Sequence, residues 1–290
     1  MVADLKELWR FRELLLAMVE RELRIRYKNS ALGFLWSLLN PLITVAVMVV
    51  VFTFLLGNHT DNFSAYILAA YLPFMFFNMA LMDASQSVLV SLPVVKKVYF
   101  PREILPLATV ISNFIHFVLA LGVFFVYLFG VWAVHGFGVS TFSWKLFALP
   151  LLLVPYLALV TGISLFVSAL NVFYEDTKYI LSVVLYLLFF VTPVMYFSET
   201  VRSSVSKYAN GDLIFTLYHL NPVATMLTAF RKVLVPSGTI EVNQHGSITQ
   251  VPPDNFQYVL VGIACLVSFA TLIWGYSFFN KMKWRFVERP

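Results

Sequence analysis

Long apolar runs separated by short polar segments dominate this chain. Six runs contain few charged residues, at 32–56, 66–90, 104–133, 146–170, 180–197 and 256–279. A helix needs about 20 mostly apolar residues to cross a bilayer, whereas the strands of a membrane barrel are alternating segments of about 10 residues. The pattern therefore predicts an all-α integral membrane protein with six transmembrane helices.

One further apolar stretch, at 213–235, does not fit this count. Pro222 interrupts it, and Arg231 and Lys232 lie near one end. We interpret it as an external re-entrant hairpin between spans five and six, with Asn221 and Pro222 at the gate. Irregular backbone at membrane depth has to be surrounded by protein or by a water-filled cavity. The hairpin therefore indicates the outer mouth of a pathway.

The N-terminal segment 1–31 is polar but periodic. Apolar residues recur among charged ones at roughly helical spacing, at Leu5, Leu8, Leu15, Val19 and Leu23. This pattern predicts an amphipathic interface helix that lies on the cytoplasmic membrane surface. A lipid anchor and a docking site for a partner protein explain such a helix equally well.

The basic residues indicate how the chain is oriented. Of the 20 lysines and arginines, fifteen lie in the segments 1–31, 91–103, 171–179 and 280–290. Six spans place these segments on one side, and basic residues concentrate on the cytoplasmic side of a membrane. Both termini are therefore expected inside. The predicted regions are the interface helix 1–31, a six-helix domain 32–280 with an external cap at 198–255, and a cytoplasmic tail 281–290.

Composition narrows the class of protein. Of the 290 residues, 60% are apolar and 12% are charged, compared with about half and a quarter in soluble domains. A soluble protein is thereby excluded, and the single cysteine, Cys265, excludes an intrachain disulfide. In a membrane protein, the net charge of +5 reports orientation rather than nucleic-acid binding.

The sequence contains no recognised signature of enzyme chemistry. It has no G-x-x-x-x-G-K-[ST] segment for ATP, and no H-E-x-x-H segment or cysteine cluster for zinc. We therefore expect no catalytic residue, cofactor or metal site on this chain. Glu175 and Asp176 are the only adjacent acidic pair. They could hold Mg²⁺, but a helix N-terminus or a docking loop is the interpretation we favour.

Polar residues interrupt two of the predicted spans. Asp83 lies in the second span, and Asn113 and His116 lie three residues apart on one face of the third. A charged group at the centre of a membrane helix costs about 2.5–3.5 kcal/mol on insertion scales. Asn113 and His116 are candidates for the polar face of a hydrated pathway. Hydrogen bonding between helices is the simpler explanation.

Five segments together carry a resemblance to a known family. They are 24–28 (RIRYK), 31–41 (ALGFLWSLLNP), 95–106 (VKKVYFPREILP), 170–179 (LNVFYEDTKY) and 220–223 (LNPV). In this order and spacing, the chain resembles the permease subunit of type-2 ATP-binding-cassette exporters, in the branch that exports lipid-linked polysaccharides. That branch includes exporters of O-antigen, capsule and teichoic acid. The resemblance covers nearly the whole chain.

The resemblance implies that this subunit does not hydrolyse ATP and that a partner supplies the energy for transport. A separate nucleotide-binding ATPase subunit would carry ATP and Mg²⁺, and two copies of each subunit would form the assembly, with the pathway between the two permeases. The contacts with the ATPase would come from the N-terminal helix and two inner loops. Their residues are Arg24, Arg26, Lys96, Lys97, Arg102, Glu103, Tyr174, Glu175, Asp176 and Lys178.

By this resemblance, the predicted function is export of an undecaprenyl-type lipid-linked polysaccharide across the bacterial cytoplasmic (inner) membrane, driven by ATP hydrolysis in the partner. One alternative is a type-2 permease for teichoic acid, another lipid or a drug. A less favoured alternative is an integral-membrane prenyl or glycosyl transferase, since only the Glu175–Asp176 pair supports it.

Overall fold

The structure is a computed structural model that describes residues 2–27, 35–51, 63–135, 144–236, 240–244, 247–251 and 257–288. The first half contains α1 (Val2–Arg10), α2 (Arg12–Tyr27), α3 (Leu35–Val50), α4 (Phe63–Val95) and α5 (Ile104–His135). The 3₁₀ helix η2 (Trp144–Ala148) leads into α6 (Leu149–Phe173) and α7 (Thr177–Val191). The remainder contains α8 (Ser198–Val205), α9 (Gly211–His219), α10 (Pro222–Leu234), strands β1 (Ile240–Gln244) and β2 (Ser247–Val251), α11 (Tyr258–Met282) and the 3₁₀ helix η3 (Lys283–Glu288).

Within the described ranges, four helices are long and apolar enough to cross a membrane, namely α4, α5, α6 and α11. They correspond to the apolar runs predicted at 66–90, 104–133, 146–170 and 256–279. The prediction of an integral membrane protein is confirmed. Helix α3 falls within the run 32–56, and α7 begins three residues before the run 180–197 and overlaps it. These helices are shorter, at 16 and 15 residues. Residues 32–34 and 52–56 of the first run lie outside the described residues.

Helix α7 ends earlier than its apolar run because of a proline. Thr192 has an extended backbone, with φ −89° and ψ 152°, and the next residue is Pro193. A proline disfavours the helical conformation of the residue before it. The chain therefore turns at 192–197 instead of continuing the helix to Phe197.

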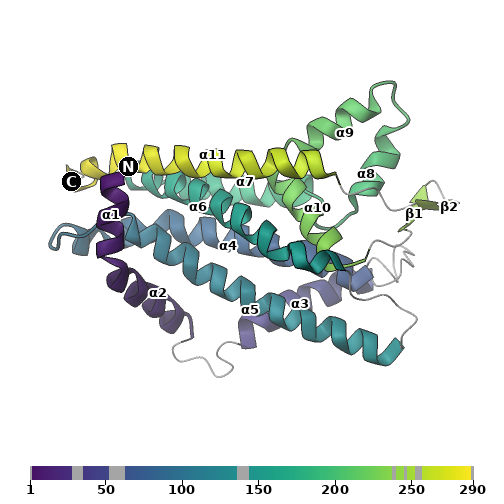
Figure 1. The fold of residues 1–290 in the computed structure, drawn as a ribbon, viewed down its shortest axis with the longest axis horizontal. Helices are drawn as coiled ribbons and strands as arrows, with labels where there is room; N and C mark the ends of the chain where they lie inside the picture. The colour runs from purple at the N-terminus through teal and green to yellow at the C-terminus, as the bar shows by residue number, and fades with distance from the viewer. Residues whose placement is uncertain are drawn as a thin grey trace.

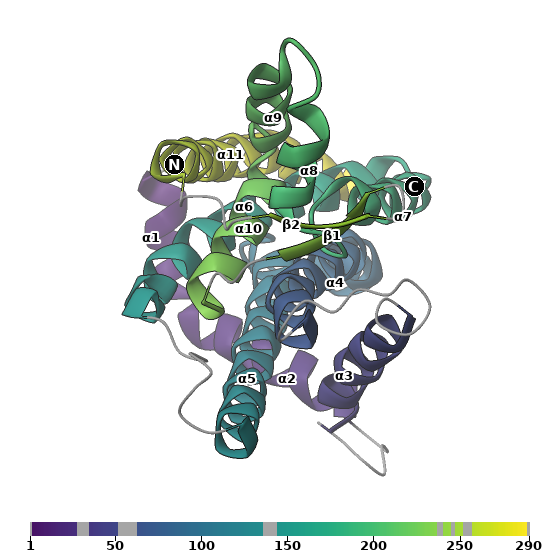
Figure 2. The same cartoon turned by 90° about the vertical axis from the view of Figure 1, so that its right-hand side faces the viewer.

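The long helices run side by side, so the chain has two distinct ends (Figure 1). Both termini lie at one end, and the ring centroids of Phe173 at the end of α6 and Phe286 of η3 are 5.8 Å apart there. The opposite end carries α8, α9 and the hairpin of β1 and β2 (Figure 2). We call these the terminal end and the hairpin end.

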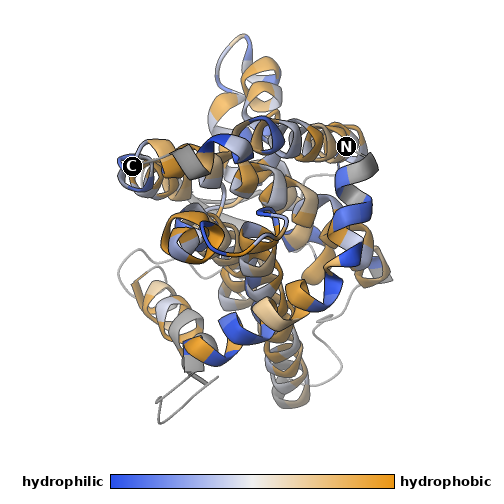
Figure 3. Ribbon diagram, turned by 90° about the vertical axis from the view of Figure 1, so that its left-hand side faces the viewer, coloured by the Kyte–Doolittle hydropathy of each residue, from blue (hydrophilic) through white to orange (hydrophobic). Residues whose placement is uncertain are grey.

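The N-terminal helices lie across the terminal end. Helix α2 packs against α5, and Val19 is buried on α2. Viewed from this side, hydrophilic residues concentrate on the N-terminal helices and near the C-terminus, in front of mainly hydrophobic helices (Figure 3). The pattern of apolar residues predicted for 1–31 thus belongs to two successive helices.

Aromatic rings fill much of the interior. Phe76 of α4 stacks on Phe117 of α5, with ring centroids 5.2 Å apart. The ring centroids of Tyr156 of α6 and Phe230 of α10 are also 5.2 Å apart. The Tyr156 hydroxyl donates a hydrogen bond to the carbonyl oxygen of Pro73 at 2.8 Å. These rings join α4, α5, α6 and α10 into one core.

Glycines bring α6 and α11 into close contact. A Cβ atom added to Gly275 would clash with the carbonyl oxygen of Gly162, and one added to Gly162 would clash with the backbone of Thr271. Small residues allow membrane helices to approach backbone to backbone. Glycine is therefore required at this crossing for steric reasons.

One small β-hairpin departs from the all-α prediction. Strands β1 and β2 pair antiparallel, with Ile240 opposite Val251 and Val242 opposite Thr249. The two segments are rich in β-branched residues, which favour strands. They lie in the predicted cap 198–255, where the apolar pattern that locates membrane helices carries no signal.

Candidate functional site

Three segments far apart in sequence meet at the terminal end. Lys283 of η3 forms ion pairs with Glu103, at 2.7 Å, and with Asp4 of α1, at 3.2 Å. Lys283 and Glu103 are both buried. Breaking a buried ion pair by removing one partner leaves an uncompensated charge and is strongly destabilising. Lys283 therefore fastens α1 and the 96–103 loop to the C-terminal segment.

A second contact between α1 and the same loop lies at the surface. The hydroxyl of Tyr99 donates a hydrogen bond to Glu7 Oε1 at 2.9 Å. This bond to a carboxylate raises the pKa of Tyr99, which keeps the phenol protonated and able to donate. The position of α1 on the loop is thus fixed at two points.

Arg102 points into the junction of these segments without a full set of acceptors. Its guanidinium carbon lies 5.9 Å from the ring centroids of Trp284 and Phe286. Among the described residues no acceptor bonds its buried Nη1 atom. Partial burial lowers the pKa of Arg102, although an arginine remains charged in proteins. The two rings hold a cation whose hydrogen-bonding capacity is incompletely used.

Arg102 lines a cleft of about 300 Å³ at the terminal end. Glu7 of α1, the loop 95–103, Lys283 and Trp284 form its walls. Lys96 and Lys97 are exposed there, and Tyr99 and Trp284 are 73% and 63% exposed. Within this cleft Glu7 and Glu103 are each engaged by a partner, so its rim is basic and aromatic. We call it the loop cleft.

The other inner loop lies at the same end of the molecule. Tyr174, Glu175 and Asp176 are exposed between α6 and α7, and the Lys178 ammonium lies 4.9 Å from the ring centroid of Tyr179. Asp176 occupies the N-cap position of α7. In the described part of the chain, no group of three or more His, Cys, Asp or Glu residues is placed to hold a metal ion.

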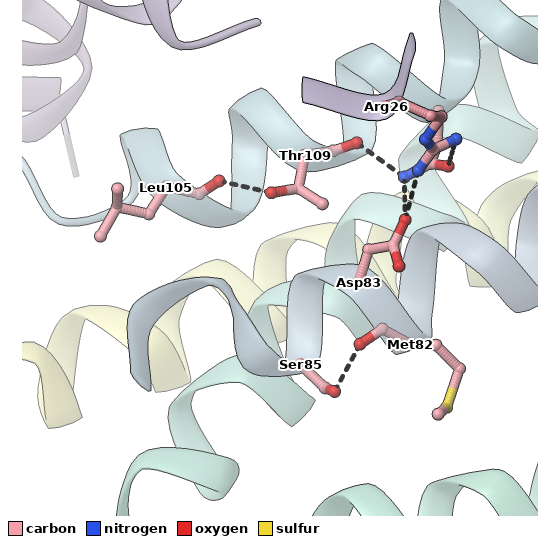
Figure 4. Close-up of polar contacts among 7 residues, drawn as sticks. Arg26, Met82, Asp83, Ser85, Leu105 and Thr109 are labelled. Atoms are coloured by element: carbon pink, nitrogen blue, oxygen red, sulfur yellow. Dashed lines mark hydrogen bonds and ion pairs between the residues drawn. The ribbon is translucent and has the colours of Figure 1, made fainter. Parts of the chain in front are cut away.

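The two arginines predicted on the N-terminal helix have different surroundings. Arg24 forms an exposed ion pair with Glu20 one turn earlier, at 2.5 Å. Arg26 turns inward and bonds Asp83 of α4 at 2.6 Å and Asn113 Oδ1 of α5 at 3.0 Å (Figure 4). We call Arg26, Asp83 and Asn113 the α2 clamp. Its contacts span 57 and 87 positions in sequence, so no local pattern could reveal them.

The predicted polar face of the third span is buried in the single chain. Asn113 and His116 are 3% and 9% exposed. The Asn113 side-chain nitrogen donates to Asp83 Oδ2 and to the carbonyl of Thr109, both at 3.0 Å. Asn113 thus forms hydrogen bonds between helices. A pathway role for this pair stays a prediction.

At the hairpin end, Asn221 and Pro222 form the start of α10. The Val223 amide donates to Asn221 Oδ1 at 3.0 Å, and Pro222 occupies the first turn. Asparagine is a favoured N-cap, and proline suits the first helical position. The pair α9 and α10 bends by 91° at this point. The sequence Asn-Pro therefore ends one helix direction and begins another.

Arg231 is a structural residue that the sequence analysis did not identify. Its guanidinium is buried and donates hydrogen bonds to four backbone carbonyls, those of Tyr66 (3.2 Å), Pro193 (2.7 Å), Val194 (3.1 Å) and Tyr196 (3.0 Å). The fixed fork of five N–H donors in arginine suits such a set. A neighbouring buried pair joins Lys232 to Glu199 at 3.4 Å. In the sequence, Arg231 lies next to Lys232 at one end of an apolar stretch. That position indicates only a charge near the end of the predicted hairpin.

Comparison with known proteins identifies the family of this chain. The model of the family described as ABC-2 type transporter matches residues 13–235. Two proteins of Klebsiella pneumoniae named O-antigen export system permease protein RfbA are each 27% identical over 276 residues, covering 95% of this chain and 94% of theirs. RfbA of Myxococcus xanthus is 28% identical over 233 residues, covering 80% of this chain and 84% of its own. Since the family model extends from α2 to the end of α10, the chain belongs to the ABC-2 type transporter family.

Proposed function

We propose that this chain is the permease subunit of an exporter that moves a lipid-linked polysaccharide of the O-antigen kind across the bacterial cytoplasmic membrane. The observation that carries the proposal is its similarity, over 95% of its length, to relatives named as O-antigen export permeases. The family membership and the absence of a phosphate-binding loop in the sequence are consistent with ATP hydrolysis in a separate subunit. ATP and Mg²⁺ would then be bound by the partner.

The proposed topology has six spans, formed by α3, α4, α5, α6, α7 and α11. The terminal end is cytoplasmic in this topology, because 15 of the 20 basic residues belong to the segments 1–31, 91–103, 171–179 and 280–290. The six-span order puts these segments on one side, and basic residues mark the cytoplasmic side. The N-terminal helices lie in the membrane interface, and the bent pair α9 and α10 enters the outer leaflet and returns. Arg231 supports this arrangement, because it donates to the carbonyls of Pro193, Val194 and Tyr196 in the turn after α7, and such carbonyls need partners in an apolar environment.

The loop cleft is the proposed docking site for the ATPase subunit. Arginine, tryptophan and tyrosine are enriched among the residues that dominate protein interfaces, and Arg102, Trp284 and Tyr99 gather here. The basic rim, with Lys96 and Lys97 exposed on it, favours an acidic side chain of the partner. The exposed loop at Tyr174, Glu175 and Asp176 would contact the partner beside this cleft.

Transport of a polymer requires two copies of the permease in this proposal. Packed aromatic rings fill the space between α4, α5, α6 and α10 of one chain, so we do not place the polymer path between these four described helices. The path would lie between two copies, under their outer hairpins. Two permeases and two ATPase subunits would form the assembly.

Affinity purification of the tagged chain in mild detergent tests the proposal. We expect a stoichiometric partner that carries a phosphate-binding loop, with ATPase activity lost when that loop is mutated. Replacing Arg102→Met should weaken the association by about tenfold, as truncation of a central interface residue does. Arg285→Met is the control, because Arg285 is exposed and lies outside the loop cleft.

Two results would contradict this proposal. Purification of an intact dimer with no ATPase partner would remove its energy source. Metal-dependent transferase activity that disappears in Glu175→Ala and Asp176→Ala variants would favour the membrane-enzyme alternative.

A further inference from the structure

The α2 clamp is a set of charged and polar contacts within the bundle, well away from the loop cleft. Arg26 Nη2 lies 2.6 Å from Asp83 Oδ2, and Arg26 Nη1 lies 3.0 Å from Asn113 Oδ1. Asp83 is 12 residues before the end of α4, and Asn113 is 9 residues after the start of α5. At 1.5 Å per residue, the clamp therefore lies about 14–18 Å along both helices from their terminal ends.

The geometry of the clamp is fixed from several sides. The Asn113 side-chain nitrogen donates to Asp83 Oδ2 and to Thr109 O, which directs its oxygen towards Arg26. Asp83 Oδ2 accepts from both other members of the clamp (Figure 4). The side chain of Arg26 is 27% exposed, compared with 77% for Arg24 two residues earlier. Arg26 is thus directed into the bundle and Arg24 away from it.

Both members of the N-terminal helix pair are therefore fastened to the bundle. Helix α1 is held by Lys283 and Tyr99, and α2 is held by the clamp. A movement of the docked ATPase at the loop cleft would displace α1 directly. Helix α2 follows α1 after a single residue, Phe11. A displacement of α1 can therefore also move α2, and through the clamp it can move α4 and α5 at a point deeper in the membrane.

We propose that Arg26 is a positioning residue for export. It holds α2 against α4 and α5, so that movement of the N-terminal helices during the ATPase cycle is transmitted to these two spans. The inference rests on the proposed function and assigns Arg26 to the permease itself instead of to the partner interface. Arg24, on the exposed face of the same helix, has no part in this transmission.

Paired substitutions separate this role from the alternatives. The variants are Arg26→Met, Asp83→Asn, the double variant Arg26→Met/Asp83→Asn and the conservative Arg26→Lys. Glu20→Gln is the matched control, since it removes the exposed ion pair with Arg24 from the same helix and leaves the arginine in place. Each is expressed with the partner ATPase, and the polysaccharide exported, the partner bound and the ATP hydrolysed are measured for each.

The proposal predicts that loss of the clamp uncouples ATP hydrolysis from export. Arg26→Met and Asp83→Asn should each lower export by about fivefold or more, while ATP hydrolysis and bound partner stay within about twofold of wild type. The double variant should be no worse than the worse single variant, because both substitutions remove the same interaction. Arg26→Lys should recover part of the export, and Glu20→Gln should stay within about twofold of wild type.

Three results would overturn the proposal. Wild-type export in the double variant would show that the clamp transmits nothing. Loss of bound partner in proportion to export would place Arg26 in the docking surface. Undiminished export in Asp83→Asn together with loss in Arg26→Met would assign the guanidinium to an anionic group of the cargo. Failure of wild type itself to export or to bind an ATPase would instead contradict the proposed function.

Discussion

Arg231 donates to four backbone carbonyls, and these carbonyls belong to residues where regular structure stops or starts. Pro193, Val194 and Tyr196 follow the end of α7, and Tyr66 lies in the first turn of α4. The three carbonyls that follow α7 lie outside any helix, and an unsatisfied polar group away from water is costly. One side chain therefore joins α10 to α7 and α4.

Replacing Arg231→Met should destabilise the protein markedly. A hydrogen bond to a charged group contributes about 1.5–3 kcal/mol, and several would be lost together. We expect a clearly lower midpoint of thermal unfolding in detergent, with only partial recovery in Arg231→Lys because an ammonium cannot reproduce the planar fork. Lys207→Met, at an exposed position between α8 and α9, should leave the midpoint unchanged. Equal midpoints for Arg231→Met and Lys207→Met would refute the structural role.

At the scale of secondary-structure elements, contact between two backbones determines how α6 and α11 cross. Gly162 and Gly275 face each other at the crossing, and a side chain on either would clash with backbone atoms. A backbone clash cannot be relieved by a change of rotamer. The two helices would have to move apart, and the ring contacts of Phe166 with Trp274 and Phe278 would be disturbed.

Substitution of two glycines on α11 tests this packing. Gly275→Ala should destabilise by about 1–3 kcal/mol because of overpacking, even though alanine favours helix over glycine by about 1 kcal/mol. Gly262→Ala is the matched control, because a Cβ there meets no atom within 4 Å, and it should be neutral or stabilising. The measurement is the thermal midpoint of both variants. A Gly275→Ala protein as stable as Gly262→Ala would show that the crossing is looser than described.

Sequence patterns predicted elements better than they predicted contacts. Runs of apolar residues locate α4, α5, α6 and α11 because crossing a bilayer imposes length and hydrophobicity on one continuous segment. The break at Asn221 and Pro222 is also predictable from the sequence, because a proline inside an apolar stretch is a local signal. The α2 clamp and the Lys283 ion pairs were not visible, because they join residues between 30 and 279 positions apart. A charge on an amphipathic helix gives no sign of whether it turns outward, as Arg24 does, or inward, as Arg26 does.

At the scale of the whole molecule, the two ends have different constructions. The terminal end gathers both termini and the 96–103 loop around buried Lys283, and it carries the basic, aromatic loop cleft. At the hairpin end, buried Arg231 joins α10 to α4 and to the turn after α7. In the proposed function, the first end receives force from the ATPase and the second closes the path. The clamp lies between them.

ATP-driven movement of cargo tests the central claim most directly. Inverted membrane vesicles containing this chain, its ATPase partner and an undecaprenyl-type lipid-linked polysaccharide would receive ATP, and the glycan protected from an externally added glycosidase would be measured. The account predicts protection that grows with ATP and is lost when the phosphate-binding loop of the partner is mutated. Vigorous ATP hydrolysis by the assembled complex without any protected glycan would contradict the account.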